Sequence, residues 1–362
     1  MGISEKIRDF EEEIKKTQKN KATEYHIGLL KAKIAKLRRE LIGSSKGGGG
    51  GGHTFDVKKS GDATVAIIGF PSVGKSTLLG KITNAESKVA AYSFTTLTCI
   101  PGMLYHKGAK IQILDLPGII EGAKDGRGRG REVMAVARGS DLVMMMLDAQ
   151  HPEHYEILIK ELGGMGIRLN QRPPDVVVKR TISGGLIINN TVKLTKIDLR
   201  TVNSILHEYG IHSGDVVIRN DIDVDQFIDV LEGNRVYLPA VVVMNKIDLV
   251  DEKALKRKFH HPYIPVSAEK GKNLEGVVEA LHSSLHFIRV YTKRRKEEAD
   301  MEEPLIVKSG ITVEGVCNQL HRDLAKNFKY SLVWGRSVKH PAQRVGLNHV
   351  LADGDIVTIV SK

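Results

Sequence analysis

A phosphate-binding loop is predicted at residues 69–76. The segment reads Gly-Phe-Pro-Ser-Val-Gly-Lys-Ser and fits the pattern G-x-x-x-x-G-K-[ST], between an apolar strand and a predicted helix. Glycines allow backbone N–H groups to face phosphate oxygens, and the helix adds the positive end of its dipole. Lys75 can reach the β- and γ-phosphates, and the Ser76 hydroxyl can ligate Mg²⁺. The residues expected to bind nucleotide here are Gly69, Phe70, Pro71, Ser72, Val73, Gly74, Lys75, Ser76 and Thr77.

Two later segments can sense a γ-phosphate. In the segment Phe-Thr-Thr-Leu at 94–97, a threonine can complete the coordination shell of Mg²⁺; we favour Thr96, and Thr95 is the alternative. Asp-Leu-Pro-Gly at 115–118 follows a predicted strand, so its Asp can hold Mg²⁺ through water while its Gly N–H meets the γ-phosphate. The expected metal ligands are Ser76, Thr96 and Asp115, and the expected catalytic groups are Thr96, Lys75 and Gly118.

The glycine- and arginine-rich stretch 121–131 lies where a γ-phosphate-dependent switch is expected. Its arginines can contact phosphate or a partner, and a solvated loop is the equal alternative. They are Arg127, Arg129 and Arg131.

Guanine is the base that the remaining motifs favour. Asn-Lys-Ile-Asp at 245–248 follows a buried strand, and Ser-Ala-Glu-Lys at 267–270 comes about twenty residues later. The Asp248 carboxylate can accept hydrogen bonds from guanine N1–H and the exocyclic amine, whereas adenine would leave it unpaired. A similar Thr-Lys-Ile-Asp at 195–198 is interpreted as a decoy. The expected base contacts are Asn245, Lys246, Asp248, Ser267, Ala268 and Glu269.

Strands and helices alternate around these motifs, as in an α/β nucleotide-binding domain. About a hundred residues separate the strands predicted at 143–147 and 241–244, whereas a strand–helix–strand unit takes roughly 30–40. We therefore expect an inserted α+β domain. The predicted organisation is a GTPase domain at 62–166 and 238–292, closed by a helix over 274–290, with the insert at 167–237.

The two ends carry separate modules. Residues 1–42 predict a helical hairpin and 43–61 a glycine-rich linker. After a charged linker at 293–304, residues 305–362 predict a compact sheet with one helix, over 313–324, that acts as a binding module.

The net charge of +11 and the pI of about 9.4 favour an anionic partner beyond the nucleotide. Residues 1–46 carry twelve basic and seven acidic side chains, and the last module carries eight and four. We expect these basic ends to contact nucleic acid. Cys99 and Cys317 lack metal or redox spacing and are expected to be reduced thiols. The N-terminus resembles no signal peptide, and the apolar run at 142–147 is too short to span a membrane, so a cytoplasmic protein is expected.

The phosphate loop at 69–76, Phe-Thr-Thr-Leu at 94–97 and Asp-Leu-Pro-Gly at 115–118 resemble the motifs of the Obg-like GTPases. Thr-Cys-Ile-Pro-Gly at 98–102, the Gly-Arg repeat at 126–131 and the insert are similar to the developmentally regulated GTP-binding proteins. The resemblance implies a P-loop GTPase domain, an insert related to domain 2 of ribosomal protein S5, and a C-terminal TGS domain of β-grasp fold. It also implies GTP hydrolysis coupled to translation, with association with ribosomes or RNA through the basic ends. Eukaryotic members bind a regulatory protein partner.

Slow hydrolysis is expected because Ile119 follows the Asp-Leu-Pro-Gly motif, where small GTPases often place a water-orienting glutamine. Catalysis would then rely on Thr96, backbone groups, a monovalent cation or a partner. Some related GTPases use K⁺ through an asparagine at the position of Ser72, which leaves a K⁺ role open. The alternative function is a GTP-dependent protein-binding switch without direct RNA contact.

Overall fold

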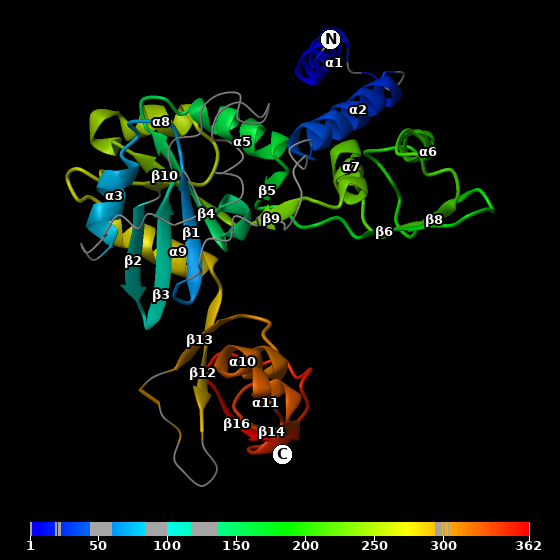
Figure 1. Cartoon of the computed structure of the whole chain (residues 1–362). Coiled ribbons are helices and arrows are strands. Elements are labelled where there is room, and N and C mark those ends of the chain that lie inside the picture. Colours follow the sequence, from blue (N-terminus) through cyan, green and yellow to red (C-terminus); the bar gives the residue numbers. More distant parts are fainter. Residues whose placement is uncertain are drawn as a thin grey trace. The chain divides into compact units, whose positions relative to one another are not determined.

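The computed structural model describes residues 2–18, 20, 23–43, 60–83, 100–116, 136–293, 299, 301–302 and 304–361. The chain divides into two compact units. Figure 1 shows its helices and strands, coloured along the sequence. One unit comprises Met1–Asp56, Ile119–Arg138 and Glu153–Leu238, and the other comprises Val57–Gly118, Gly139–Pro152 and Pro239–Lys362. Each unit is described separately below.

The second unit contains a six-stranded sheet in the order β11-β10-β4-β1-β3-β2. Only β2 runs antiparallel to its neighbour; the other strands are parallel. The carboxyl ends of the parallel strands therefore meet at one edge, where ligands bind in such sheets. The strands are β1 (Ala63–Ile68), β2 (Ile100–His106), β3 (Ala109–Asp115), β4 (Leu142–Asp148), β10 (Ala240–Asn245) and β11 (Ile264–Pro265).

The centre of this sheet is completely buried. Every residue of β1 and β4 is buried, which explains their continuous apolar sequences, since a parallel strand must be apolar on both faces. Helices α3 (Lys75–Ile82) and α9 (Leu274–Ser284) pack their apolar residues into the same core. A short helical turn η3 (Ile247–Leu249) and helix α8 (Glu252–Lys258) follow β10.

The chain ends in a five-stranded sheet in the order β13-β12-β16-β14-β15. Helices α10 (Val313–Leu320) and α11 (Arg322–Lys326) contribute Val313, Val316 and Leu324 to the core on one face of this sheet. The strands are β12 (Phe287–Thr292), β13 (Leu305–Lys308), β14 (Phe328–Trp334), β15 (Gln343–Val345) and β16 (Asp355–Ser361).

Two predicted helices differ from the structure. The helix predicted over 274–290 ends at Ser284, and β12 begins at Phe287. Residues 288–290 alternate buried, exposed and buried, and the segment is rich in β-branched and aromatic residues that favour a strand. Because β12 pairs with β13 and β16, residues 287–292 join the C-terminal sheet, not the GTPase segment to which they are assigned above.

The helix predicted over 313–324 is divided in two. His321 has an extended backbone (φ −164°), and its side chain accepts a hydrogen bond from Asp323 N, so it ends α10 and caps α11. Cys317 lies buried in α10 as a free thiol, whereas Cys99 lies outside the described residues.

The first unit holds the N-terminal helices and the inserted elements. A three-stranded sheet of order β6-β8-β7 packs against α6 and α7, and the short strands β5 and β9 pair in parallel. The elements are α5 (His154–Gly164), β5 (Ile167–Leu169), β6 (Val176–Arg180), β7 (Leu186–Asn190), α6 (Leu199–Glu208), β8 (Gly214–Ile218), α7 (Val224–Glu232) and β9 (Val236–Leu238).

The N-terminal residues form the two predicted helices, α1 (Ile3–Lys16) and α2 (Glu24–Gly43). Ala32 and Ala35 of α2 join the apolar core of the insert. Residues 44–59 of the glycine-rich segment that follows lie outside the described part of the chain. Within the described residues, no helix is both long and apolar enough to cross a membrane.

Candidate nucleotide-binding site

The predicted phosphate loop connects β1 to α3 at the carboxyl edge of the six-stranded sheet. Gly69 and Gly74 are required by the local geometry. A Cβ at Gly69 would lie 2.4 Å from the carbonyl oxygen of Met146, and one at Gly74 would lie 2.4 Å from Asn245 Nδ2. Gly74 also has φ +94°, which glycine adopts readily. The loop therefore keeps its shape only with these two glycines.

Lys75 begins helix α3 and points back across the loop. Its Nζ donates to the carbonyl oxygens of Phe70 (2.9 Å) and Gly69 (3.2 Å), and the residue is 8% exposed. Burial lowers the pKa of Lys75, while the charge of Asp115 opposes this effect. The ammonium is thus held inside the loop, among the backbone groups that would surround a phosphate.

Ser76 and Asp115 are brought together from α3 and the end of β3. Ser76 Oγ donates to Asp115 Oδ2 at 2.6 Å, across 39 positions of sequence. The other carboxylate oxygen, Oδ1, is buried and has no hydrogen-bond partner among the described residues. Two of the three predicted metal ligands are therefore neighbours, with one carboxylate oxygen left to accept a further bond.

Asn245 connects the phosphate loop to the predicted base-binding segment. Its side chain is buried, and Nδ2 donates to the carbonyl oxygen of Val73 (2.8 Å). Its Oδ1 accepts from the backbone N–H of Ala268 (2.9 Å). One amide thus satisfies two backbone groups from opposite sides of the site.

Asn245→Ala is expected to lower the free energy of unfolding by about 2–4 kcal/mol, because it leaves a buried carbonyl and a buried N–H without partners. Urea unfolding monitored by circular dichroism measures this change. Leu249→Ala serves as the control, because Leu249 lies in the same region, at the end of turn η3, but is 57% exposed. A loss below 0.5 kcal/mol for Asn245→Ala, roughly that of a surface substitution, would contradict the bridging role.

Asp248 lies in the turn η3 with its carboxylate near two donors. Lys270 Nζ lies 2.9 Å from Asp248 Oδ2. Hydrogen bonds from the Ser267 and Lys270 side chains lower the pKa of Asp248 to about 2. The carboxylate therefore stays ionised throughout the neutral range and can accept hydrogen bonds from a base.

Two contacts at this site were not predicted from the sequence. Lys246 Nζ lies 2.7 Å from Asp148 Oδ2, and Lys270 covers Asp248 as described. The parallel register places Asp148 beside Asn245, because β4 and β10 are neighbours. Asp148 could have been recognised in the sequence as an acidic residue at the carboxyl end of a buried strand, β4.

The second Asn-Lys-Ile-Asp-like segment has a structural role. Asp198 is the N-cap of α6, and its side chain accepts from the backbone N–H of Thr201 (2.6 Å). This aspartate therefore caps a helix of the insert, a role that accounts for its side chain without a nucleotide.

The structure does not test every predicted residue. Ser267 and Ala268 are buried beside Asn245, and the Glu269 carbonyl accepts from Lys81 Nζ. The remaining predicted switch and catalytic positions lie outside the described residues; they are Thr95, Thr96, Gly118, Ile119, Arg127, Arg129 and Arg131.

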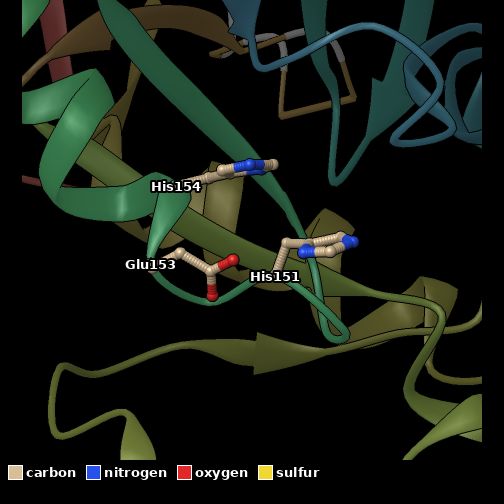
Figure 2. A group of neighbouring side chains, drawn as sticks. All are labelled: His151, Glu153 and His154. Carbon is tan, nitrogen blue, oxygen red and sulfur yellow. The ribbon is translucent and has the colours of Figure 1, made fainter.

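A second group of side chains with ligand chemistry lies in the turn between β4 and α5. Figure 2 shows His151, Glu153 and His154 close together, with their ligand atoms within 4.8 Å of one another. Imidazole and carboxylate groups are common Zn²⁺ ligands. His151 and Glu153 are exposed, however, and all three residues take part in other interactions, so we assign the group no role.

Comparisons with known proteins identify the family of the chain. Residues 64–180 match the family described as "50S ribosome-binding GTPase", 183–287 match its C-terminal region, and 288–361 match the TGS domain. A developmentally regulated GTP-binding protein 1 homologue of Dictyostelium discoideum is 51% identical, with all of both chains covered. An uncharacterised GTP-binding protein of Methanocaldococcus jannaschii is 56% identical over 100% of this chain and 94% of the relative.

A solved GTP-binding protein from Pyrococcus horikoshii OT3 aligns with a TM-score of 0.45 and 17% identity, covering 83% of this chain and 100% of the other. The full-length identity to the curated relatives, together with the matched GTPase and TGS domains, confirms the predicted resemblance. The chain belongs to the developmentally regulated GTP-binding proteins, and it is a GTPase.

Proposed function

We propose that the residues at the carboxyl edge of the six-stranded sheet bind GTP in a defined orientation. The loop 69–76 surrounds the phosphates, with Lys75 at the β- and γ-phosphates. Asp248 reads the guanine, and the Ala268 N–H faces its O6. The observation that carries this proposal is the double bridge of Asn245, which fixes the phosphate loop and the base segment relative to each other.

The residues present fit a magnesium ion. GTPases of this family generally bind GTP or GDP with Mg²⁺, which prefers oxygen ligands and neutralises charge on the phosphates. Ser76 supplies a hydroxyl 2.6 Å from the Asp115 carboxylate. Asp115 Oδ1, which has no partner within the described parts of the chain, can accept from a water of the metal shell. Thr96 is proposed as the third ligand.

Hydrolysis at this site transfers the γ-phosphoryl group to water, and the chain's main contribution is to position charge. The Lys75 ammonium stabilises negative charge on the phosphate oxygens, and the Gly118 N–H is proposed to do the same. Ile119 cannot orient the attacking water because its side chain forms no hydrogen bonds. We therefore propose a slow intrinsic rate that a cation or a partner raises.

Single-turnover GTP hydrolysis by the purified chain is expected to be slow, well below the 1–100 s⁻¹ that phosphoryl-transferring kinases reach. Reactions in KCl and in NaCl at equal ionic strength test whether K⁺ supplies the missing stabilisation. Stimulation by K⁺ would assign the role to a monovalent cation, whereas equal slow rates would assign it to a partner. Rapid hydrolysis in both salts would contradict the proposed slow switch.

We further propose that the chain acts on ribosomes in the cytoplasm as a translation factor. The description of the matched GTPase family as ribosome-binding supports this role, and so does the net charge of +11. Proteins that neutralise RNA phosphates with lysine and arginine bind with strong salt dependence.

The two ends contribute unequally to this positive charge. In α2, Lys31 pairs with Asp225 (2.5 Å) and Lys36 with Glu208 (3.2 Å), both from the insert. Arg38 pairs with Glu11 of α1. Several basic side chains of the hairpin are therefore neutralised within the first unit, which places more of the proposed RNA contact on the C-terminal module.

Co-sedimentation with ribosomes tests the proposed role of the ends. Chains lacking 1–42, lacking 288–362, or lacking both are compared with the full chain over a range of salt concentrations; the second deletion removes β12, apart from Phe287, together with the sheet that it joins. We expect the C-terminal deletion to weaken binding more and to reduce its salt dependence. Salt-sensitive binding that survives both deletions would contradict the basic-ends proposal and favour the GTPase domain or a protein contact.

A further inference from the structure

The helices of the C-terminal module pack on only one face of its sheet, and on the other face the β12–β13 end, with Ile306, packs into the core of the six-stranded sheet. Residues of α10 and α11 pack with Ile288, Val333 and Val357 on the inner face. Side chains alternate along each strand, so the intervening positions of β12, β14, β15 and β16 lie on the opposite face. These outer-face residues are Phe287, Arg289, Tyr291, Tyr330, Leu332, Trp334, Arg344, Ile356, Thr358 and Val360. Phe287 packs against the core of the six-stranded sheet and Arg289 pairs with Asp353, which leaves the part of the face around β14, β15 and β16.

Strand pairing places the aromatic residues on the same face of the sheet. Trp334 of β14 pairs with Ile356 of β16, which pairs in turn with Tyr291 of β12. Tyr330 lies four positions before Trp334 on the same strand and so on the same side. All four side chains are partly exposed. Three aromatic rings therefore border a surface formed by adjacent strands.

Two cations lie directly over these rings. The Arg344 guanidinium is 4.2 Å from the centroid of Tyr330, and Lys293 Nζ is 5.1 Å from the centroid of Trp334. Such cation–π contacts show that Arg344 and Lys293 share the face with the rings. None of the outer-face residues named above is acidic. The face thus combines stacking surfaces with positive charge.

We propose that this outer face of the C-terminal sheet binds single-stranded RNA. Unpaired bases stack on aromatic rings and on guanidinium planes, while nearby cations contact the backbone phosphates. Tyr330 and Trp334 provide the rings; Arg344 and Lys293 are long enough to leave the rings for phosphate when a base takes their place. A duplex, whose bases are already stacked and covered, cannot use the rings in this way.

This inference rests on the proposed association with RNA and specifies the surface and the state of the RNA. Trp334 is the only tryptophan of the chain, so tryptophan fluorescence reports directly on this face. The full chain is titrated with a single-stranded oligouridylate of about ten nucleotides, within the range of known single-strand sites, and with a duplex of equal length. We expect the single strand to quench Trp334 and to bind more tightly than the duplex.

Variants in the full chain locate the contact. Tyr330→Ala and Arg344→Ala are each expected to weaken single-strand binding on the order of tenfold, as loss of one stacking partner does. Tyr330→Phe keeps the ring and should retain the affinity, which separates stacking from a general loss of fold. Lys326→Ala removes one exposed charge from α11, outside the sheet face, and Tyr105→Ala removes an exposed ring from β2; both are controls.

The results of these RNA titrations can be distinguished from those of ribosome co-sedimentation, which tests the proposed function. Single-strand binding without quenching of Trp334, equal binding of the duplex, or an equal effect of Lys326→Ala would overturn the assignment of this face. It would also be overturned if Tyr330→Ala abolished ribosome binding while leaving single-strand binding intact, since the face would then contact protein. Single-strand binding with quenching, but without ribosome co-sedimentation, would contradict only the proposed ribosomal role.

Discussion

Asp248→Asn is expected to weaken GTP binding on the order of a hundredfold. The carboxylate of Asp248 is proposed to accept hydrogen bonds from guanine N1–H and the exocyclic amine, and bonds to a charged group are worth about 1.5–3 kcal/mol each. Asparagine removes the charge and turns an N–H toward the base donors. The pKa of about 2 ensures that the wild-type carboxylate is ionised in the assay. Fluorescence titration with a labelled GTP analogue measures the change.

Xanthosine triphosphate is the matched ligand for this variant. Its C2 carbonyl oxygen replaces the guanine amine and can accept from the new asparagine N–H, so its binding should improve while that of GTP falls. This gain would show that the variant is folded. If Asp248→Asn retained its preference for GTP over xanthosine triphosphate, Asp248 would not be the residue that reads the base.

Lys75→Ala is expected to reduce single-turnover GTP hydrolysis by about 10²–10³-fold at saturating GTP, the range for loss of one preorganised charge-stabilising group. The structure holds the ammonium within the loop, bonded to the carbonyls of Gly69 and Phe70. Rapid quenching of a single turnover measures the effect on chemistry separately from nucleotide binding.

Lys81→Ala provides the comparison for this second experiment. Lys81 lies on the same helix and is exposed, and its Nζ donates to the Glu269 carbonyl at the rim of the site. It should change the hydrolysis rate little. Equal losses in the two variants would indicate a general effect of helix α3, and a fully active Lys75→Ala would exclude Lys75 from phosphate stabilisation.

The local motifs predicted the phosphate loop well because its geometry is set by consecutive residues. Gly74 must adopt a positive φ, and Lys75 follows it directly at the start of a helix. The apolar runs of β1 and β4 were equally readable, since a buried parallel strand requires continuous apolar residues.

Strand β12 shows where local patterns fail. Its apolar residues follow a real helix without a glycine or proline between them, so a helix and a strand fit the sequence equally well. The strand forms because β13 and β16 pair with it, and β13 begins more than ten residues later along the chain. That tertiary information is absent from the segment itself.

The ion pairs at the candidate site were also beyond prediction. Lys246 and Asp148 are 98 positions apart, with the whole insert between them, and meet only because β4 and β10 are adjacent in the sheet. The pairing of Asp248 with Lys270 likewise depends on how the turn η3 and the segment 267–270 approach each other. Sequence spacing suggested both segments but not which side chains would touch.

The most direct test of the central claim is co-sedimentation of the full chain with ribosomes, compared between a non-hydrolysable GTP analogue and GDP at the same salt concentration. A GTP-driven switch requires a difference in affinity between the two states, and typical coupling energies of 1–3 kcal/mol correspond to about 5–150-fold. We predict tighter binding with the GTP analogue, and loss of that difference in Asp248→Asn. Equal binding with both nucleotides would contradict a guanine-nucleotide switch that acts on the ribosome.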